Sequence, residues 1–424
     1  MKKYRRRIAD QILQRKLQGK GAVLIEGPKW CGKTTTAEQI AKSFLYMNDP
    51  KTIRQNLSMA EIDPKRLLQG ETPRLIDEWQ LAPKLWDTIR FEVDHRHDLG
   101  QFILTGSSVP PETEEIKHSG TGRISWLTMR TMSLYESGES TGEISLQELF
   151  ATPEKISGAT SADIEQLAFF VCRGGWPQAI DMVGELALDQ AIDYYDGVVH
   201  SDINRADNVN KNPERVKRLM RSFARMQGAQ APNSVICEDI DTNDDGTVNE
   251  ETVGRYVNAL KKIFVIEDMP AWNPNLRSKT AIRTSDTRYY TDPSIAAAAL
   301  GLGPADLLAD LNTFGLLYET LAVRDLRVYT GSLGGQVYHY RDKGGLECDA
   351  VIHLRNGTYG LIEIKLGGDR LIEEGVKTLQ ALAGKIDTDK MKAPSFLMVL
   401  TGIGDYAYRR QDGVYIVPIT TLKN

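Results

Sequence analysis

A short apolar run near the N-terminus, residues 21–26, is followed by a glycine-rich loop and then by a helical pattern. Within residues 34–44 the apolar side chains Ala37, Ile40 and Phe44 recur at a spacing that places them on one face of a helix. The pattern therefore predicts a buried strand at 21–26 and an amphipathic helix at 34–44. Strand, glycine loop and helix in this order are typical of the start of an α/β domain.

Two further apolar runs predict buried strands in the same domain, at residues 74–77 and 101–105. Helical segments separate these runs. This alternation is typical of a mostly parallel, doubly wound sheet, which binds its ligand at the carboxyl ends of its strands. The fold class that we expect is α/β, with this sheet in the N-terminal part of the chain.

The remainder of the chain shows two other patterns. Residues 144–227 are mainly helical, and a clear helix is expected over 251–263, ahead of a short strand. After residue 336 strands dominate, and we expect them at 337–340, 348–354, 359–364 and 396–400. Helix, polar loop, helix and short strands are what a winged-helix module shows, although this pattern is not specific to that module.

The composition is that of a soluble globular protein with two to four domains. Its 424 residues exceed one ordinary core, and 41% of them are hydrophobic and 26% charged. No apolar stretch approaches the roughly 20 residues that span a bilayer, and the basic N-terminus lacks the apolar segment of an export signal. The four cysteines form no CxxC pair, so we expect reduced thiols and a cytoplasmic protein. The net charge of −5 carries no signature of nucleic-acid binding.

The glycine loop has the pattern of a phosphate-binding P-loop. It comprises Gly27, Pro28, Lys29, Trp30, Cys31, Gly32, Lys33 and Thr34, and Thr35 follows it. Glycines allow consecutive backbone N–H groups to converge on phosphate oxygens. We expect Lys33 to contact the β- and γ-phosphates and the Thr34 hydroxyl to ligate Mg²⁺. An ordinary glycine turn is the alternative, but the strand–loop–helix context favours a nucleoside triphosphate, foremost ATP.

A carboxylate pair, Asp77 and Glu78, ends the strand predicted at 74–77. A Mg²⁺-dependent hydrolase needs a carboxylate at the end of a strand that neighbours the loop. We therefore expect Asp77 as an outer ligand of the metal and Glu78 as the base that polarises the attacking water. An apolar pair followed by Asp-Glu is common in turns, but its combination with a P-loop favours the catalytic interpretation.

Hydroxyl side chains end the next predicted strand, and one arginine follows a flexible glycine-containing loop. Ser107 is expected to contact the γ-phosphate or the attacking water, although the sequence does not separate its role from that of Thr105. A simple Ser/Thr turn is the alternative. Arg123 has two equal interpretations, a residue that stabilises transition-state charge and a surface or ion-pair arginine.

With these residues identified, the chain resembles a family of prokaryotic AAA-type ATPases that carry a C-terminal domain of unknown function related to PD-(D/E)XK nucleases. The match rests on GPKWCGKT at 27–34, LIDEWQ at 75–80, LTGSS at 104–108, SGTGRI at 119–124, RGGWP at 173–177 and ETLAVRDLRVY at 319–329. It covers nearly the whole chain, and its first two segments are quite specific.

The resemblance implies ATP binding and a division of the chain into four parts. They are an AAA-type P-loop ATPase core at 1–155, a helical lid at 156–228, a winged-helix-like segment at 229–285 and a PD-(D/E)XK nuclease-like domain at 286–424. AAA-type ATPases often assemble into rings in which a neighbour's arginine completes each site, so a homo-oligomer is possible and the role of Arg123 stays open.

Asp349, Glu363 and Lys365 form a candidate D…ExK arrangement near the C-terminus. A hairpin of the two expected strands would bring them together, because residues two apart on a strand share a face. Asp349 and Glu363 would then hold Mg²⁺, and Lys365 would activate water for attack on a phosphodiester. The resemblance adds Glu319 as an accessory carboxylate. A solvated strand edge is the usual explanation of E-x-K alone, and a binding module that does not cleave stays open beside a nuclease.

Two charged segments complete the sequence picture. Residues 241–248 are similar to the start of a calcium loop, but its twelfth position is Thr252, where a bidentate Glu is needed, so we expect a solvated turn. The basic helix at 215–225 could contact a nucleic-acid backbone, and the ordinary basic surface of a lid is the alternative.

The sequence thus predicts a cytoplasmic, Mg²⁺-dependent ATPase of AAA type that couples nucleotide state to a nuclease-like domain. The alternative is a nucleotide-switched nucleic-acid-binding or interaction protein whose nuclease-like domain is inert. A third hypothesis is a metal-dependent nuclease gated by ATP. The expected cofactors are ATP and Mg²⁺. DNA, RNA and further copies of the chain are the partners that the sequence allows, and no membrane is expected.

Overall fold

The computed structural model describes residues 4–108, 119–152, 156–207, 209–230, 232–240, 249–274 and 285–424. The acidic segment at 241–248 lies outside the described residues. The chain forms two compact units. The first comprises Met1–Thr131, Ser201–Asn210 and Ala259–Phe264, and the second comprises Met132–His200, Lys211–Asn258 and Val265–Asn424. Within the described part of the chain, no helix has the length and apolar character needed to span a bilayer.

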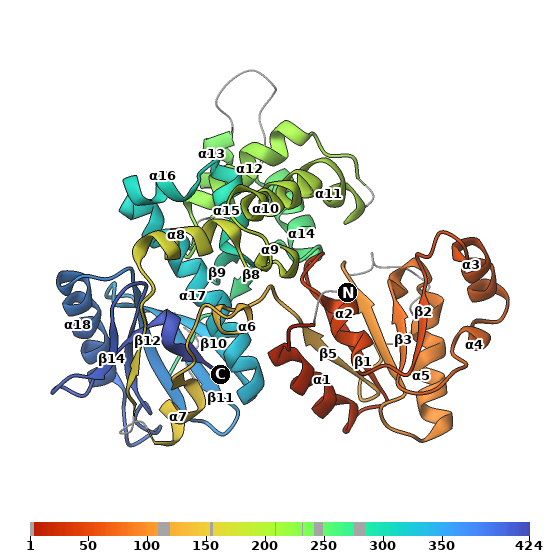
Figure 1. Ribbon diagram of the computed structural model, residues 1–424, viewed down its shortest axis with the longest axis horizontal. Helices are drawn as coiled ribbons and strands as arrows, with labels where there is room; N and C mark the ends of the chain where they lie inside the picture. Colours follow the sequence, from red (N-terminus) through yellow and green to blue (C-terminus); the bar gives the residue numbers. More distant parts are fainter. Residues whose placement is uncertain are drawn as a thin grey trace. The chain divides into compact units, whose positions relative to one another are not determined.

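The first unit is built on a five-stranded parallel sheet with the order β2-β3-β4-β1-β5 (Figure 1). Its strands are β1 (Ala22–Glu26), β2 (Ser43–Tyr46), β3 (Arg74–Asp77), β4 (Phe102–Gly106) and β5 (Ile124–Thr128). Its helices are α1 (Ile8–Leu17), α2 (Lys33–Glu38), α3 (Ile53–Ile62), α4 (Pro64–Leu67), the 3₁₀ turn η1 (Trp79–Leu81) and α5 (Lys84–Arg96). The predicted parallel α/β sheet is confirmed, and the three strands expected at 21–26, 74–77 and 101–105 are present.

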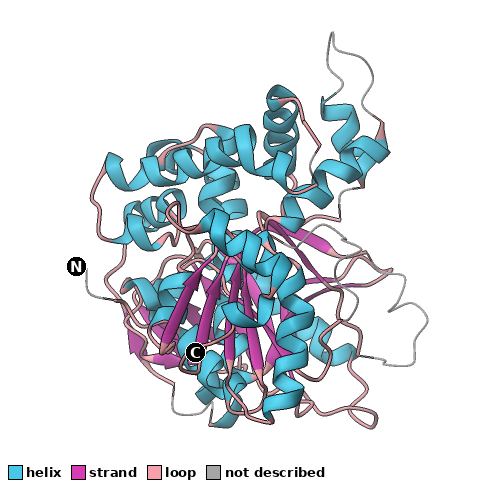
Figure 2. Ribbon diagram, turned by 90° about the vertical axis from the view of Figure 1, so that its right-hand side faces the viewer, coloured by secondary structure: helices cyan, strands magenta, loops and turns pink. Residues whose placement is uncertain are grey.

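Helices cover both faces of this sheet, because its central strands are apolar at nearly every position. Leu24, Ile76 and Leu104 pack against Leu85 and other side chains of α5 in one core cluster. Residues that alternate with these, such as Ile103, point to the other face and are also fully buried. Figure 2 shows the strands with helices against them. The carboxyl ends of β1, β3 and β4 consequently meet at one edge of the sheet.

The helix after the P-loop is shorter than the apolar pattern predicted. It ends at Glu38, and Phe44 lies in strand β2, so the prediction of a helix over 34–44 was wrong in its second half. Phe44 stacks on Tyr46, with ring centroids 6.3 Å apart, and pairs with Leu75 of β3. The helical spacing of the apolar residues is local, whereas pairing with a distant strand decides the conformation here.

The second unit begins with short elements and a helical region. These are α6 (Leu134–Ser137), β6 (Ile144–Ser145), α7 (Leu146–Ala151), β7 (Gly158–Ala159), α8 (Ile164–Arg173), α9 (Pro177–Ile180) and α10 (Glu185–Gly197). The chain continues through the π-helical turn η3 (Val198–Asp202), α11 (Ile203–Arg205), α12 (Pro213–Arg225), α13 (Asn233–Ile240) and α14 (Glu250–Lys262). An antiparallel ribbon of β8 (Ile266–Met269) and β9 (Thr287–Tyr290) follows, and then α15 (Pro293–Leu300) and α16 (Pro304–Ala309).

A seven-stranded mixed sheet with the order β10-β11-β12-β13-β15-β14-β7 completes the second unit. The elements are α17 (Leu311–Leu333), β10 (Gly335–Arg341), β11 (Glu347–Leu354), β12 (Tyr359–Lys365), α18 (Asp369–Lys385), β13 (Leu397–Thr401), β14 (Tyr406–Arg409), β15 (Tyr415–Pro418), the turn η5 (Ile419–Thr421) and β16 (Leu422–Lys423). β10, β11 and β12 are antiparallel, and β12, β13 and β15 are parallel. Leu379 of α18 packs on Val351, Leu361 and Val399 in the core of this sheet.

Candidate nucleotide site

The P-loop connects β1 to α2, as the sequence predicted, and its backbone requires glycine at two positions. Gly27 has a φ of 150° and Gly32 a φ of 100°, where residues other than glycine are strained. A Cβ atom on Gly27 would lie 2.0 Å from the carbonyl oxygen of Met129. Only glycine therefore fits the path of the loop at this point. Thr35 is exposed, and its carbonyl oxygen accepts a hydrogen bond from Gln39.

The Lys33 side chain is buried within the loop. Its Nζ donates hydrogen bonds to the carbonyl oxygens of Gly27, at 2.9 Å, and Pro28, at 2.7 Å. These neutral acceptors hold the ammonium group without cancelling its charge. A phosphate oxygen would compete well against them, because an ionised acceptor makes a stronger hydrogen bond to an ammonium group than a carbonyl does.

Buried contacts hold the middle of the loop in place. Cys31 is fully buried, and its Sγ lies 3.5 Å from the carbonyl oxygen of Met129. The guanidinium group of Arg7 donates to the carbonyl oxygens of Cys31 and Arg130, at 2.8 Å each. Trp30, in contrast, is 58% exposed. Arg7 is a supporting residue that no sequence pattern indicates, because its partners lie 24 and 123 positions further along the chain.

Asp77, the last residue of β3, is contacted by one side chain from helix α2 and one from strand β4. One oxygen of its carboxylate, Oδ1, accepts hydrogen bonds from the Thr34 hydroxyl, at 2.6 Å, and from the Thr105 hydroxyl, at 2.5 Å. Thr105 reaches it because β4 lies between β1 and β3 in the sheet. The structure therefore brings together the predicted Thr34 and Asp77, and it places Thr105 beside the carboxylate that we expected near a metal.

Glu78 follows Asp77 in an unusual backbone conformation. Its φ of 55° and ψ of 44° lie in the left-handed region, which non-glycine residues adopt mainly where the surroundings impose it. Gln80 donates a hydrogen bond to Glu78 Oε2, and the Ser107 hydroxyl lies 3.4 Å from the same oxygen. The structure thus separates the two hydroxyl candidates. Ser107 lies beside Glu78, and Thr105 lies beside Asp77.

The electrostatic surroundings of Glu78 suit a base. Burial raises the pKa of Glu78 above its ordinary value, and the neighbouring Asp77 carboxylate raises it further. The positive charge of Lys33, the hydrogen bond from Gln80 and the charge of Lys29 act in the opposite direction. A carboxylate with a raised pKa takes a proton more readily, so this position favours general-base chemistry. Gln80 was not identified as a candidate, although it lies within the LIDEWQ segment.

Arg123 lies at the other end of the sheet from the P-loop. Its carbonyl oxygen accepts a hydrogen bond from the backbone N–H of Ala22, the first residue of β1, whereas the loop follows the last residue of that strand. At about 3.3 Å per residue, the two ends are roughly 13 Å apart. Its Nε lies 2.8 Å from Asp94 Oδ1. Within its own chain, Arg123 is therefore an ion-pair residue remote from the loop.

The predicted C-terminal cluster forms across the antiparallel pair β11–β12. Lys365 Nζ lies 3.0 Å from Asp349 Oδ2 and 2.7 Å from Glu363 Oε2. The backbone N–H of Ile364 also donates to Asp349 Oδ2, at 2.7 Å. The hairpin expected from the sequence is thus present and brings the three side chains together. Among the described residues, no group of three or more His, Cys, Asp or Glu side chains has an arrangement suited to a metal ion.

Two carboxyl groups that the Asp349 charge affects, Glu363 and Glu319, have strongly shifted pKa values. Burial, with a contribution from Asp349, raises the pKa of Glu363 to about 8. Burial and the Asp349 charge likewise raise the pKa of Glu319 in α17 to about 7. The Tyr289 hydroxyl donates to Glu319 Oε1 at 2.7 Å. Perturbed titratable groups that lie close together are typical of functional sites, although structural ion pairs share this property.

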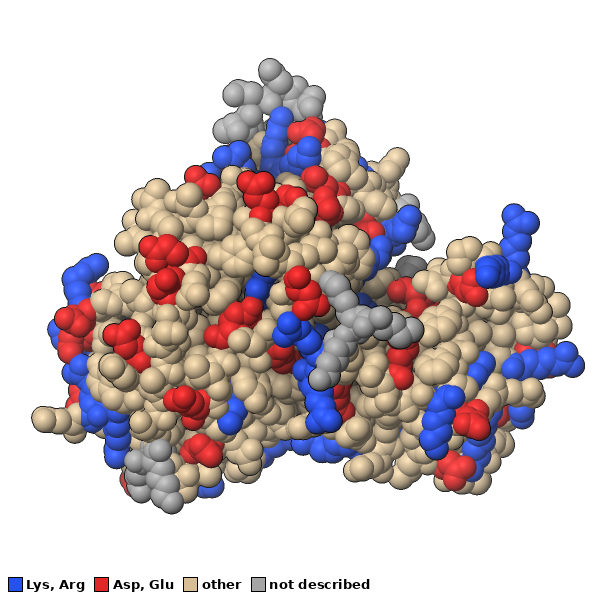
Figure 3. All heavy atoms as spheres, in the orientation of Figure 1, with Lys and Arg blue, Asp and Glu red and all other residues tan. Residues whose placement is uncertain are grey.

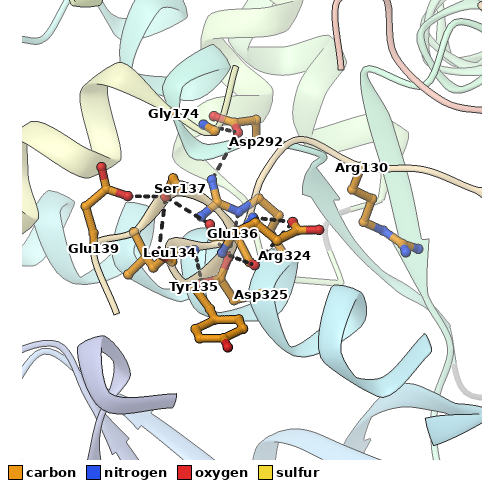
Figure 4. Close-up of polar contacts among 12 residues, drawn as sticks. Arg130, Leu134, Tyr135, Glu136, Ser137, Glu139, Gly174, Asp292, Arg324 and Asp325 are labelled. Atoms are coloured by element: carbon orange, nitrogen blue, oxygen red, sulfur yellow. Dashed lines mark hydrogen bonds and ion pairs between the residues drawn. The ribbon is translucent and has the colours of Figure 1, made fainter. Parts of the chain in front are cut away.

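A second buried cluster joins the RGGWP and ETLAVRDLRVY segments (Figure 4). Arg324 in α17 lies 3.1 Å from Asp292 Oδ2 and 2.7 Å from Asp325 Oδ1. Asp292 accepts a hydrogen bond from the Gly175 backbone N–H at 2.9 Å, and Asp325 accepts one from Leu134 at 2.9 Å. The second unit therefore has a buried ion-pair network that ties four distant segments together.

Comparison with known families gives a match for the segment that contains the P-loop. Residues 19–138 match the model of an AAA domain. This segment is therefore similar to P-loop domains of the AAA type. Residues 164–306 and 314–422 match two models of domains of unknown function, DUF8612 and DUF4143 respectively. Neither of these two matches supplies a function for the second unit.

Two relatives are similar to most of this chain. Uncharacterized proteins of Mycobacterium bovis and Mycobacterium tuberculosis are each 24% identical over 365 residues, which are 85% of this chain and 74% of the relative. Among solved structures, the Walker-type ATPase of Pyrococcus abyssi is 13% identical, with 69% of this chain and 94% of that chain covered and a TM-score of 0.42. The replication initiator DnaA, bound to AMPPCP and single-stranded DNA, is 13% identical, with coverages of 60% and 86% and a TM-score of 0.28.

Proposed function

We propose that the chain is a Mg²⁺-dependent ATPase of the AAA type. The observation that supports this most strongly is the convergence of Thr34 and Thr105 on Asp77, directly beside a buried Glu78. A phosphate-binding loop alone would bind nucleotide. A metal-ligand pair and a base with a raised pKa at the same sheet edge add what hydrolysis needs.

The residues at this edge fit a magnesium ion. The Thr34 hydroxyl and the Asp77 carboxylate offer the hard oxygen donors that Mg²⁺ prefers, and few protein ligands suffice because this ion keeps several waters. When bound, Mg²⁺ would offset the negative charge of the phosphates. Lys33 would bind the β- and γ-phosphate oxygens, and Glu78 would take a proton from the attacking water, with Ser107 beside it.

Removal of the metal is expected to stop the reaction. We predict that the wild-type protein releases phosphate from ATP in the presence of Mg²⁺ and that EDTA lowers the rate to the background without enzyme. Adding Mg²⁺ back should restore the rate. A rate that EDTA leaves unchanged would contradict a magnesium-dependent reaction at Thr34 and Asp77.

We further propose that the second unit ends in a PD-(D/E)XK nuclease-like domain, and one observation favours cleavage of phosphodiesters. The ammonium group of Lys365 contacts both Asp349 and Glu363, so a lysine and two carboxylates share one small site. Asp349 and Glu363 would hold a divalent cation, and Lys365 would orient the attacking water. The two contacts to Lys365 would rearrange when a cation binds.

The test of this activity is incubation of plasmid DNA and labelled DNA and RNA oligonucleotides with Mg²⁺ or Mn²⁺, with and without ATP. We expect metal-dependent cleavage that Asp349→Ala abolishes. Glu374→Ala, which removes an exposed carboxylate of α18 in an ion pair with Arg370, should cleave as the wild type does. Absence of cleavage of every substrate by the wild type would leave the inert, nucleotide-switched binding protein as the better proposal.

The binding alternative rests on helix α12 and on the elements after it. Helices α13 and α14 precede the β8–β9 ribbon, an order that suits a winged-helix module. The basic side chains of α12 are partly balanced, since Arg225 pairs with Asp239 at 2.9 Å and Lys217 with Glu214 at 3.1 Å. Figure 3 shows Lys and Arg interspersed with Asp and Glu on the face it displays. These observations support nucleic-acid binding less than the P-loop geometry supports ATP hydrolysis.

A further inference from the structure

An acidic residue far along the chain contacts the P-loop. Lys29 Nζ lies 2.5 Å from Asp202 Oδ1, and the two residues are 173 positions apart. Asp202 belongs to the segment Ser201–Asn210, which is part of the same compact unit as the loop. The Asp202 side chain is 15% exposed and that of Lys29 38%. The pair is thus half-shielded from water, where charges interact more strongly than on an open surface.

Lys29 also lies within electrostatic reach of the proposed catalytic base. Its charge lowers the pKa of Glu78, together with that of Lys33, against the effect of burial. The loop therefore carries two lysines that differ in their partners. Lys33 is held by neutral carbonyl oxygens, whereas Lys29 is held by a carboxylate. Of these contacts, only that between Lys29 and Asp202 places a negative charge beside the loop that would bind the phosphates.

From this arrangement we infer that Asp202 competes with the nucleotide's phosphates for Lys29, so that the segment bearing Asp202 senses whether the P-loop is occupied. This inference rests on the proposed ATPase function and adds a regulatory residue to the same site. A triphosphate brings several negative charges to the loop, and Asp202 repels them while it occupies the Lys29 ammonium group. Binding of ATP exchanges one partner of Lys29 for the other and releases Asp202.

The competition predicts an unusual gain of affinity on removal of a charge. Asp202→Asn should tighten ATP binding by roughly threefold to tenfold. The substitution removes the ion pair that holds Lys29, which is weak because it is half-exposed, and it also removes the repulsion between the Asp202 carboxylate and the phosphates. The affinity for ADP, which has one phosphate fewer, should increase by a smaller factor. Asp202→Glu keeps the charge and should bind ATP as the wild type does. Lys29→Met should weaken ATP binding.

A double-mutant cycle measured by isothermal titration of ATP and ADP, in the presence of Mg²⁺, tests this directly. The effect of Asp202→Asn on ATP affinity should largely vanish in the Lys29→Met background, because Asp202 and the phosphates no longer have the Lys29 ammonium group to compete for. Asp207→Asn, a neutralised acidic residue of the same segment, is the matched control and should leave the affinity unchanged. Thermal melting of each variant shows whether it is folded.

Three results would overturn the inference. In the first, Asp202→Asn binds ATP with unchanged or weaker affinity than the wild type. In the second, the substitution increases the affinity for ATP and for ADP by the same factor. In the third, it increases the affinity for ATP as much in the Lys29→Met background as in the wild type. Failure of the ATPase proposal is distinguishable from these. In that case the wild-type protein does not bind ATP at all, or Lys33→Ala binds it as well as the wild type.

Discussion

Glu78→Gln is expected to bind ATP with near wild-type affinity but to turn it over at least roughly 100-fold more slowly. A positioned general base contributes typically about 10²- to 10⁴-fold to a rate, and the amide keeps the size of the side chain while it cannot take the proton. The amide can also keep the hydrogen bond that Glu78 accepts from Gln80. In this variant, the affinity measured by titration should therefore stay close to that of the wild type, while the turnover measured by phosphate release falls.

The control for Glu78→Gln is Glu61→Gln in helix α3. Glu61 is an exposed carboxylate of the same unit whose partner is Lys84, so both its binding and its turnover should match the wild type. Two outcomes would contradict the role of Glu78. One is turnover within a few-fold of the wild-type rate, and the other is a loss of ATP binding equal to the loss of turnover.

Arg324→Met is expected to lower the free energy of unfolding by about 3–5 kcal/mol. The Arg324 side chain is only 1% exposed and those of Asp292 and Asp325 are fully buried, so its removal leaves two carboxylates without their cation in an apolar interior. Burial already raises the pKa of Asp325 to about 6 in the presence of Arg324. The loss of the guanidinium group would raise the cost of that charge further.

Urea-induced unfolding followed by circular dichroism measures this effect. The matched control is Arg370→Met, which removes an exposed arginine from its ion pair with Glu374 in α18 and should change stability by less than about 0.5 kcal/mol. If Arg324→Met were as stable as this control, the buried network would not hold the four segments together in the way that its geometry indicates.

Features of the site that depend on neighbouring residues could be predicted from the sequence. The P-loop, the Asp77–Glu78 pair and the Asp349, Glu363 and Lys365 cluster each follow from local patterns. The P-loop needs a strand and a helix on either side of the glycines. The C-terminal cluster needs only a hairpin and the period of a strand, because this period places Glu363 and Lys365 on the same face.

Contacts between distant segments could not be predicted in this way. The pairing of Phe44 with Leu75 changed a predicted helix into a strand, and no local signal opposed the helical spacing. Lys29 and Asp202 are in contact only because the segment Ser201–Asn210 belongs to the first unit, although Met132–His200 before it belongs to the second. The register of β4 against β3 pairs Asp77 with Thr105 and leaves Ser107 beyond the end of β4, whereas their closeness in sequence left the two hydroxyls equivalent.

The most direct test of the central claim, that this P-loop hydrolyses ATP, is steady-state phosphate release by the wild-type protein and Lys33→Ala, side by side in Mg²⁺. Loss of the buried ammonium group removes a charge-assisted hydrogen bond worth about 1.5–3 kcal/mol, so we expect the variant to be at least about tenfold slower. A clear wild-type rate that falls in Lys33→Ala is the predicted result. Equal rates in the two proteins, or no rate above background in the wild type, would contradict the claim.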